Sequence, residues 1–251
     1  MGIDINKIFM KILKNYSLIV ALWIILISCT VTDETGPKVF DLDYMAHISP
    51  ENFVNKVTNK FFPLSVGSTY TYVGESAGGI ERIEIEILSD TRVVMGITCT
   101  IVRDKVYKND VLIEDTFDWY AQDKDGNVWY FGEDVDNYID GVVDNHYGSW
   151  EAGVGGAEPG IIMLANPVLN LKYRQEHHVG QAEDQGEVVE KNVALTVIAG
   201  SFTGCLKIKE TNPLDPDFLE YKYFAPGIGN IKVEKIDTPV ETEELESYDI
   251  K

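Results

Sequence analysis

The densest group of side chains that could do chemistry lies between residues 174 and 184. The run RQEHH at 174–178 is followed closely by Glu183 and Asp184. On a strand Glu176 and His178 point to the same face, and a following turn brings the two acidic residues opposite them. Imidazole and carboxylate groups ligate zinc or a similar divalent ion, and they also form general acid–base pairs. The group predicts either a metal-binding site or a hydrolase site, built on Glu176, His178, Glu183 and Asp184, or else a solvated hairpin.

Aromatic side chains form a second candidate site. Trp119 and Tyr120 lie on one expected strand and Trp129-Tyr130-Phe131 on the next, with Trp150 soon after. Neighbouring side chains on a strand point to opposite faces, so one aromatic set fills the core and the other is exposed or covered by a loop. Exposed rings beside polar groups form walls for a sugar, a peptide or an apolar small molecule. We therefore expect either core packing alone or a ligand site formed by Trp119, Trp129, Tyr130, Trp150, Glu151 and Gln175.

Other motifs of enzymes and metal sites do not match. There is no Gly-x-Ser-x-Gly elbow, phosphate loop or dinucleotide fingerprint. The run DKDGN at 123–127 resembles a calcium loop, but that alignment places Gly132 where a bidentate Glu is required. We interpret it as a hairpin turn. No cofactor is expected apart from a divalent metal at residues 174–184, and whether the chain is an enzyme stays open.

The N-terminus has the pattern of an export signal. Lysines at 7, 11 and 14 precede an apolar run at 16–27, which is shorter than the roughly 20 residues of a membrane-spanning helix. Residues 1–28 are therefore predicted to be a cleaved signal peptide. The ending Leu-Ile-Ser-Cys at 26–29 resembles a bacterial lipobox, which implies acylation of Cys29 and anchoring in a lipid bilayer. We expect a location in the cell envelope, at the outer membrane on its periplasmic or surface side.

Composition limits the partners and the fold class. The formal net charge of −20 repels nucleic acid and anionic lipid headgroups, so nucleic-acid binding is not expected. The sequence leaves three classes of partner possible: a small molecule, a glycan or an envelope protein. The 13 Tyr, 10 Phe and 4 Trp favour strands over helices.

Apolar and polar residues alternate, with a period of two residues, through most of the chain. In IERIEIEIL, isoleucines at 83, 85 and 87 alternate with Glu84 and Glu86, which is the pattern of a half-buried strand. Short strands with turns about every 10 residues predict an antiparallel meander that forms a closed or half-open β-barrel, with a two-sheet sandwich as the alternative. The five glycines and two prolines at 148–170 predict a long loop.

The expected organisation has four parts. A flexible tether at 29–59 follows the signal peptide, a single β domain spans 60–236, and an acidic tail occupies 237–251. Cys99 and Cys205 remain within the domain, and an exported protein can oxidise such a pair. Either a disulfide or two free thiols fits the sequence.

Several segments carry a resemblance to a known group of proteins. They are FFPLSVGSTYTYVGES, DTFDWYAQDKDGNVWYFGED, PGIIMLANP, YRQEHHVGQAED and YKYFAPGIGNIKVE, between residues 60 and 235. These resemble a family of uncharacterised secreted bacterial β-domain lipoproteins, and the resemblance implies a recurring β unit without implying an activity. The sequence thus favours an anchored binding or envelope structural module, with a hydrolase or metal-dependent enzyme as the alternative.

Overall fold

The computed structural model describes residues 44–76, 78–236 and 240–251. The expected signal peptide, Cys29 and the first part of the expected tether lie outside the described residues. Within those ranges the chain is almost entirely β-strand, and the one helical turn is a 3-10 turn at Pro50–Asn52. None of the described residues form a helix that is long and apolar enough to cross a membrane.

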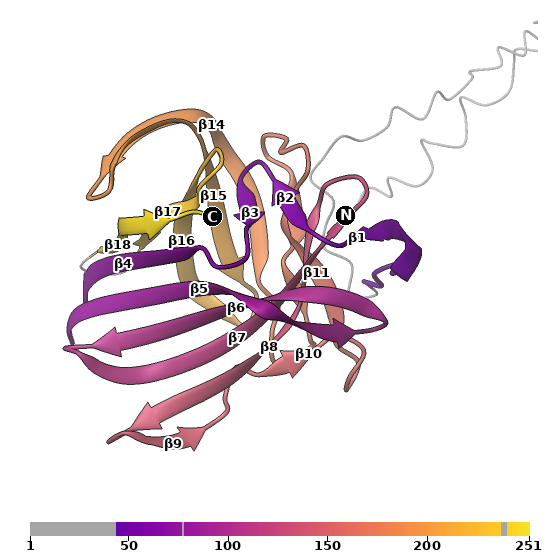
Figure 1. Cartoon of the computed structure of the whole chain (residues 1–251), viewed down its shortest axis with the longest axis horizontal. Helices are drawn as coiled ribbons and strands as arrows, with labels where there is room; N and C mark the ends of the chain where they lie inside the picture. Colours follow the sequence, from indigo (N-terminus) through magenta and orange to yellow (C-terminus); the bar gives the residue numbers. More distant parts are fainter. Residues whose placement is uncertain (1–43, 77, 237–239) are drawn as a thin grey trace, which may run out of the picture. The chain divides into compact units, whose positions relative to one another are not determined.

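One antiparallel sheet contains nearly all of the strands (Figure 1). Its long strands are β4 (Thr69–Ser76), β5 (Gly79–Val94), β6 (Ile97–Lys108), β7 (Val111–Asp123), β8 (Val128–Ile139), β14 (Gln185–Val197), β15 (Gly200–Asn212), β16 (Asp215–Ala225), β17 (Gly229–Lys235) and β18 (Glu241–Asp249). Its short strands are β1 (Phe53–Val54), β9 (Val142–Asn145), β10 (Trp150–Glu151), β11 (Glu158–Met163), β12 (Lys172–Arg174) and β13 (Glu176–His177). A separate small sheet pairs β2 (Val57–Asn59) with β3 (Phe62–Leu64).

The order of the strands shows a barrel that is nearly closed. The main path runs β12-β14-β15-β16-β17-β18-β4-β5-β6-β7-β8-β11-β13. Its two ends, β12 and β13, are separated in the chain by Gln175 alone, so one short segment pairs first with β14 and then with β11. The backbone of Gly160 on β11 packs directly on Gln175, since a Cβ on this glycine would lie 2.3 Å from the Gln175 carbonyl carbon. The sequence prediction of an all-β, antiparallel barrel is confirmed.

Alternation explains why the wall has an inner and an outer face. On β5, Ile85 and Ile87 line the barrel interior, whereas Glu84 and Glu86 face outward beside Arg103. The register between β5 and β6 shifts between Ile87 and Thr91. Such irregularities increase local twist and curl a sheet, which long strands need in order to close.

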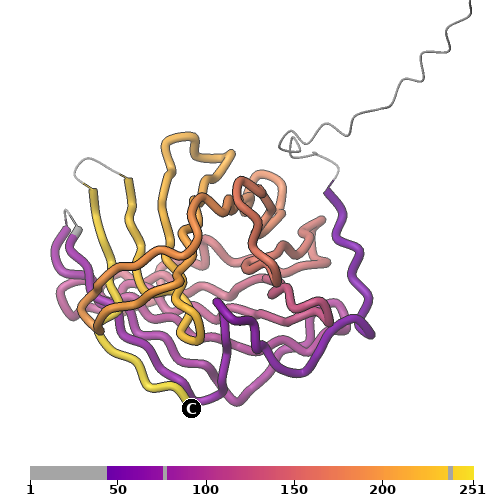
Figure 2. The backbone as a smooth tube through the Cα atoms, turned by 90° about the horizontal axis from the view of Figure 1, so that it is seen from above, coloured from indigo at the N-terminus to yellow at the C-terminus, as the bar shows by residue number. Residues whose placement is uncertain are grey.

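Two segments, one at the C-terminus and one within the domain, are more ordered than the sequence predicts. Instead of an acidic tail, residues 241–249 form β18, which pairs with β17 on one side and β4 on the other. Figure 2 shows the yellow C-terminal strand beside the purple strand β4. Leu245 is fully buried, and this one apolar anchor holds a strand that is otherwise rich in Glu. The glycine-rich segment 148–170 contains the short strands β10 and β11 between its turns.

The last part of the expected tether, 57–59, belongs to a hairpin that packs on one end of the barrel. Phe62 on β3 lies with its ring 5.2 Å from that of Tyr120 and 6.4 Å from that of Phe224. Asn59 donates hydrogen bonds to the carbonyls of Gly126 and Leu164. The β2–β3 hairpin therefore plugs the end of the barrel at which the β7–β8 turn lies.

Candidate functional site

The predicted aromatic site is largely filled with packed side chains. Trp119 and Trp150 are 3% and 5% exposed. The Tyr130 ring stacks on Tyr120 at 4.8 Å and meets Trp150 edge-on at 5.3 Å. Arg92 lies over Trp119 with its guanidinium carbon 4.0 Å from the ring centroid. These rings form core and leave little space for a ligand among them.

Three predicted residues around these rings have other partners. Glu151 forms an ion pair with Arg92. The indole nitrogen of Trp129 donates to Asp123 at 2.8 Å, beside a cleft of about 390 Å³ that His47 and Phe53 also line. Gln175 is 2% exposed and donates to Glu210 across the barrel closure at 2.7 Å.

The four predicted metal or catalytic residues separate into two pairs. The carboxyl groups of Glu176 and Asp184 are hydrogen bonded to each other at the barrel wall. His178 and Glu183 belong to the turn outside it, where His178 contacts Gln181 at 3.1 Å and Glu183 accepts from the Gly180 amide at 2.8 Å. No group of three or more His, Cys, Asp or Glu in the described ranges is arranged to hold a metal ion.

The two cysteines lie in the wall of the barrel. Cys99 and Cys205 are both free thiols, and both are fully buried. Burial raises the pKa of the Cys99 thiol to about 12, so this thiol is not reactive in the folded chain.

A cavity lies inside the barrel, and none of the predicted site residues lines it, although Tyr130 and Gln175 donate hydrogen bonds to residues that do. It consists of two adjoining spaces of about 200 and 220 Å³ that share five lining residues. The first space lies against the β2–β3 hairpin, and the second extends toward the opposite end of the strands. The shared residues are Tyr72, Ile85, Asp104, Lys222 and Asn230.

One wall of this cavity carries a tight ion-pair group from β15 and β16. The ammonium of Lys222 lies 2.6 Å from a carboxylate oxygen of Glu210 and 3.0 Å from one of Glu220. Burial opposes the charged form of Lys222, but the two carboxylates outweigh it and raise the pKa of the lysine well above its usual value. Lys222 therefore stays charged, and its charge is already matched by two anions.

The facing wall, on β6 and β7, holds two further carboxyl groups. The Oδ1 atom of Asp104 is buried without a hydrogen-bond partner in the described part of the chain. Burial, followed by the charges of Asp118 and Glu114, raises the pKa of Asp104 well above its usual value. Asp118 accepts a hydrogen bond from Tyr130 at 2.6 Å, and burial still raises its pKa to about 6.

Acidic side chains continue from this wall toward the barrel closure. Burial, and then the charges of Asp118 and Glu176, raise the pKa of Glu133 to about 9. Burial, with Asp184 as the next cause, raises the pKa of Glu176 to about 8. At neutral pH these two carboxyl groups keep their protons, because their pKa values lie above 7.

Sequence reasoning missed the groups in the cavity, although a signal for them existed. Asp104 and Glu210 occupy positions at which the inward face of the preceding part of the strand is apolar. Asp104 lies two residues after the buried Val102, and Glu210 lies two residues after the buried Ile208, so each lies on the same face of its strand as that neighbour. A charged residue in register with buried aliphatic ones, on a strand of a barrel, indicates an interior polar site rather than solvent.

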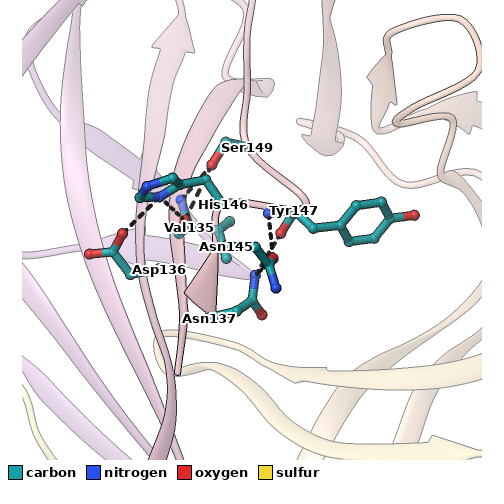
Figure 3. Close-up of polar contacts among 7 residues, drawn as sticks. All are labelled: Val135, Asp136, Asn137, Asn145, His146, Tyr147 and Ser149. Carbon is teal, nitrogen blue, oxygen red and sulfur yellow. Dashed lines mark hydrogen bonds and ion pairs between the residues drawn. The ribbon is translucent and has the colours of Figure 1, made fainter. Parts of the chain in front are cut away.

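A separate polar network lies on the outside, where β9 leads into β10 (Figure 3). His146 contacts the carbonyl oxygen of Val135 at 3.0 Å and a carboxylate oxygen of Asp136 at 2.9 Å. Asn137 donates to the Asn145 side chain and to the Tyr147 carbonyl. These contacts fix the turn to the edge of β8, and we assign the network a structural role.

Comparison with known proteins gives a limited picture. No protein-family model matches the chain, and no curated protein matches it. Similar solved structures include a candidate exported protein from Bacteroides fragilis, described as having a YmcC-like fold, at 15% identity and a TM-score of 0.43. Another is a candidate lipoprotein from Parabacteroides distasonis, at 14% identity and a TM-score of 0.43. Each alignment covers 76% of this chain and 99% of the other chain.

Proposed function

We propose that this chain is a lipid-anchored protein of the bacterial cell envelope whose barrel binds a small amphipathic molecule in its interior. The anchor is supported by the signal peptide pattern at 1–28 and by the lipobox that ends at Cys29. Binding is supported by the cavity between the β2–β3 hairpin and the facing strands.

The observation that carries the proposal is the carboxyl group of Asp104, which lines this cavity and whose buried Oδ1 atom has no hydrogen-bond partner among the described residues. A buried polar atom without a hydrogen bond costs about 1–3 kcal/mol, and a bound donor removes that cost. Most of the surrounding lining is aromatic or aliphatic, including Tyr70, Ile87 and Phe224. An apolar pocket with a few convergent polar groups is the usual composition of a small-molecule site.

Binding is tested with the mature chain, residues 29–251, and the fluorescent apolar probe N-phenyl-1-naphthylamine. We expect a saturable rise in fluorescence that Val102→Phe abolishes, because Val102 lines the cavity and is 6% exposed. Val93→Phe is the matched control, since Val93 lies on β5 and is 64% exposed. Circular dichroism checks that both variants fold. Equal probe binding by the two variants would place the probe outside the barrel and refute the proposal.

The anchor is tested separately in a bacterial host that processes lipoproteins. Metabolic labelling with an alkyne-bearing fatty acid should mark the full chain, and Cys29→Ser should lose the label and leave the membrane fraction. Retention of the label in Cys29→Ser would show that Cys29 is not the lipidated residue.

A further inference from the structure

The charges around the cavity are unequal in sign. Asp104, Asp118 and Glu210 line its first space, and Glu220 and Glu243 join the second. Among the described residues that line either space, Lys222 is the only cationic side chain. Two carboxylates already contact its ammonium, at 2.6 and 3.0 Å.

Asp104 and Asp118 lie close together on the inner face of neighbouring strands (β6 and β7 in Figure 1). Asp104 pairs with Thr116, and Val102 pairs with Asp118, so the two carboxyl groups are diagonal neighbours across the ladder. Asp118 already accepts a hydrogen bond from Tyr130. Asp104 offers a buried oxygen that no donor in the described residues occupies. This oxygen is a second observation, independent of the number of acidic groups.

We infer that the ligand in the barrel is an amphipathic amine, with its ammonium group held by Asp104 and Asp118 and its apolar part against the rings beside the β2–β3 hairpin. This inference rests on the proposed function and specifies its ligand class. Charge-assisted hydrogen bonds between ammonium and carboxylate are stronger than neutral ones.

The apolar part of the ligand has a defined place. Phe62 and Leu64 of the hairpin line the first space at one end. Tyr70, Ile87 and Val102 of the wall lie in the same cross-strand rows as the two aspartates. The carboxyl groups of Asp104 and Asp118 lie along the same space. A molecule with one apolar end and one cationic end fits this division.

Competing ligand classes are less well matched. An anion would have to use Lys222, whose charge is matched by Glu210 and Glu220, and would face the other carboxylates. A neutral alcohol could donate one hydrogen bond to Asp104 but would leave the negative charge of the wall uncompensated. Burial and neighbouring carboxylates raise the pKa of Asp104. A bound cation would offset the effect of the neighbouring carboxylates and so favour the charged form of Asp104.

The test compares three probes of equal chain length in displacing N-phenyl-1-naphthylamine from residues 29–251 at pH 7.5. They are octylamine, octanol and octanoate. We expect octylamine to bind at least tenfold more tightly than octanol, and octanoate to bind most weakly. Asp104→Asn should weaken octylamine at least tenfold while changing octanol less than twofold, which also shows that the variant is folded. Asp134→Asn, on the exposed face of β8, is the matched control and should change neither.

The outcomes separate the two claims. Equal affinity for octylamine and octanol, or an unchanged octylamine affinity in Asp104→Asn, would overturn the amine inference and leave barrel binding intact. Tightest binding of octanoate would assign the site to an anion at Lys222 and also overturn it. Failure of the naphthylamine probe to bind the wild-type chain would refute the proposed function itself.

Discussion

Replacing Lys222 with methionine removes the positive charge that holds Glu210 and Glu220 together. The two glutamates are direct cross-strand partners on β15 and β16, and their side chains are 3% and 8% exposed. Breaking a buried ion pair by removing one partner costs about 3–5 kcal/mol. The lysine side chain is itself 29% exposed and lines the cavity, so we expect the lower end, about 3 kcal/mol at pH 7.5.

The sign of the pH dependence distinguishes charge from packing. Without the lysine, the folded-state pKa values of Glu210 and Glu220 rise above the unfolded value of about 4.3. The unfolded chain then loses these protons at lower pH than the folded chain, so the penalty grows as pH rises above about 4.3. It should largely vanish at pH 4, where both states hold the protons.

The assay is urea unfolding of wild type and Lys222→Met at pH 4 and pH 7.5, followed by tryptophan fluorescence. Adding Glu210→Gln and Glu220→Gln to Lys222→Met is the compensating control, and it should recover most of the lost stability at pH 7.5. A loss of equal size at both pH values would mean that the methylene packing of Lys222 matters rather than its charge. An unchanged stability at pH 7.5 would refute the ion-pair reasoning altogether.

Three further changes test other parts of the barrel. Glu133→Gln should raise the free energy of unfolding at pH 8 by about 1–2 kcal/mol. The wild-type carboxyl, with a pKa of about 9, holds a proton in the folded state that the unfolded state has lost. Urea midpoints at pH 5 and pH 8 measure this gain, and an equal gain at both pH values would contradict the reasoning. Phe62→Ala should cost about 2–3 kcal/mol and speed release of N-phenyl-1-naphthylamine in stopped-flow fluorescence, unless the β2–β3 hairpin does not cover the cavity. Truncation after residue 240 removes β18 and should abolish cooperative thermal unfolding in circular dichroism, whereas a cooperative transition would show that β4 and β17 tolerate open edges.

The sequence was sufficient for the architecture because alternation on β5 and its neighbours is strong. Ile83, Ile85 and Ile87 alternate with Glu84 and Glu86, and this pattern fits only a strand with one buried face. The C-terminal strand was missed because a single apolar residue, Leu245, anchors it among many glutamates. Its position depends on pairing with β4, from the other end of the domain, and local patterns contain no information on such pairing.

The cavity could not be predicted for a different reason. Trp119 and Trp150 were reasonable candidates for a ligand wall, but the structure packs them into the core. Conversely, Asp104 has the parity of the buried Val102, but this parity does not show that the barrel interior contains space. Whether a closed sheet is filled or hollow depends on the sum of all inward side chains, which no single segment reveals.

The pairing of β18 with β4 also has a consequence for biosynthesis. Asp249 lies opposite Thr69, so the strand that completes the wall is the last part of the domain to be synthesised. Until it arrives, β4 and β17 each have an open edge whose backbone groups lack a partner. Contacts between segments so far apart in sequence form slowly. The nascent chain therefore remains an unfinished sheet until β18 has been synthesised, and until then its open edges can pair with a strand of another chain.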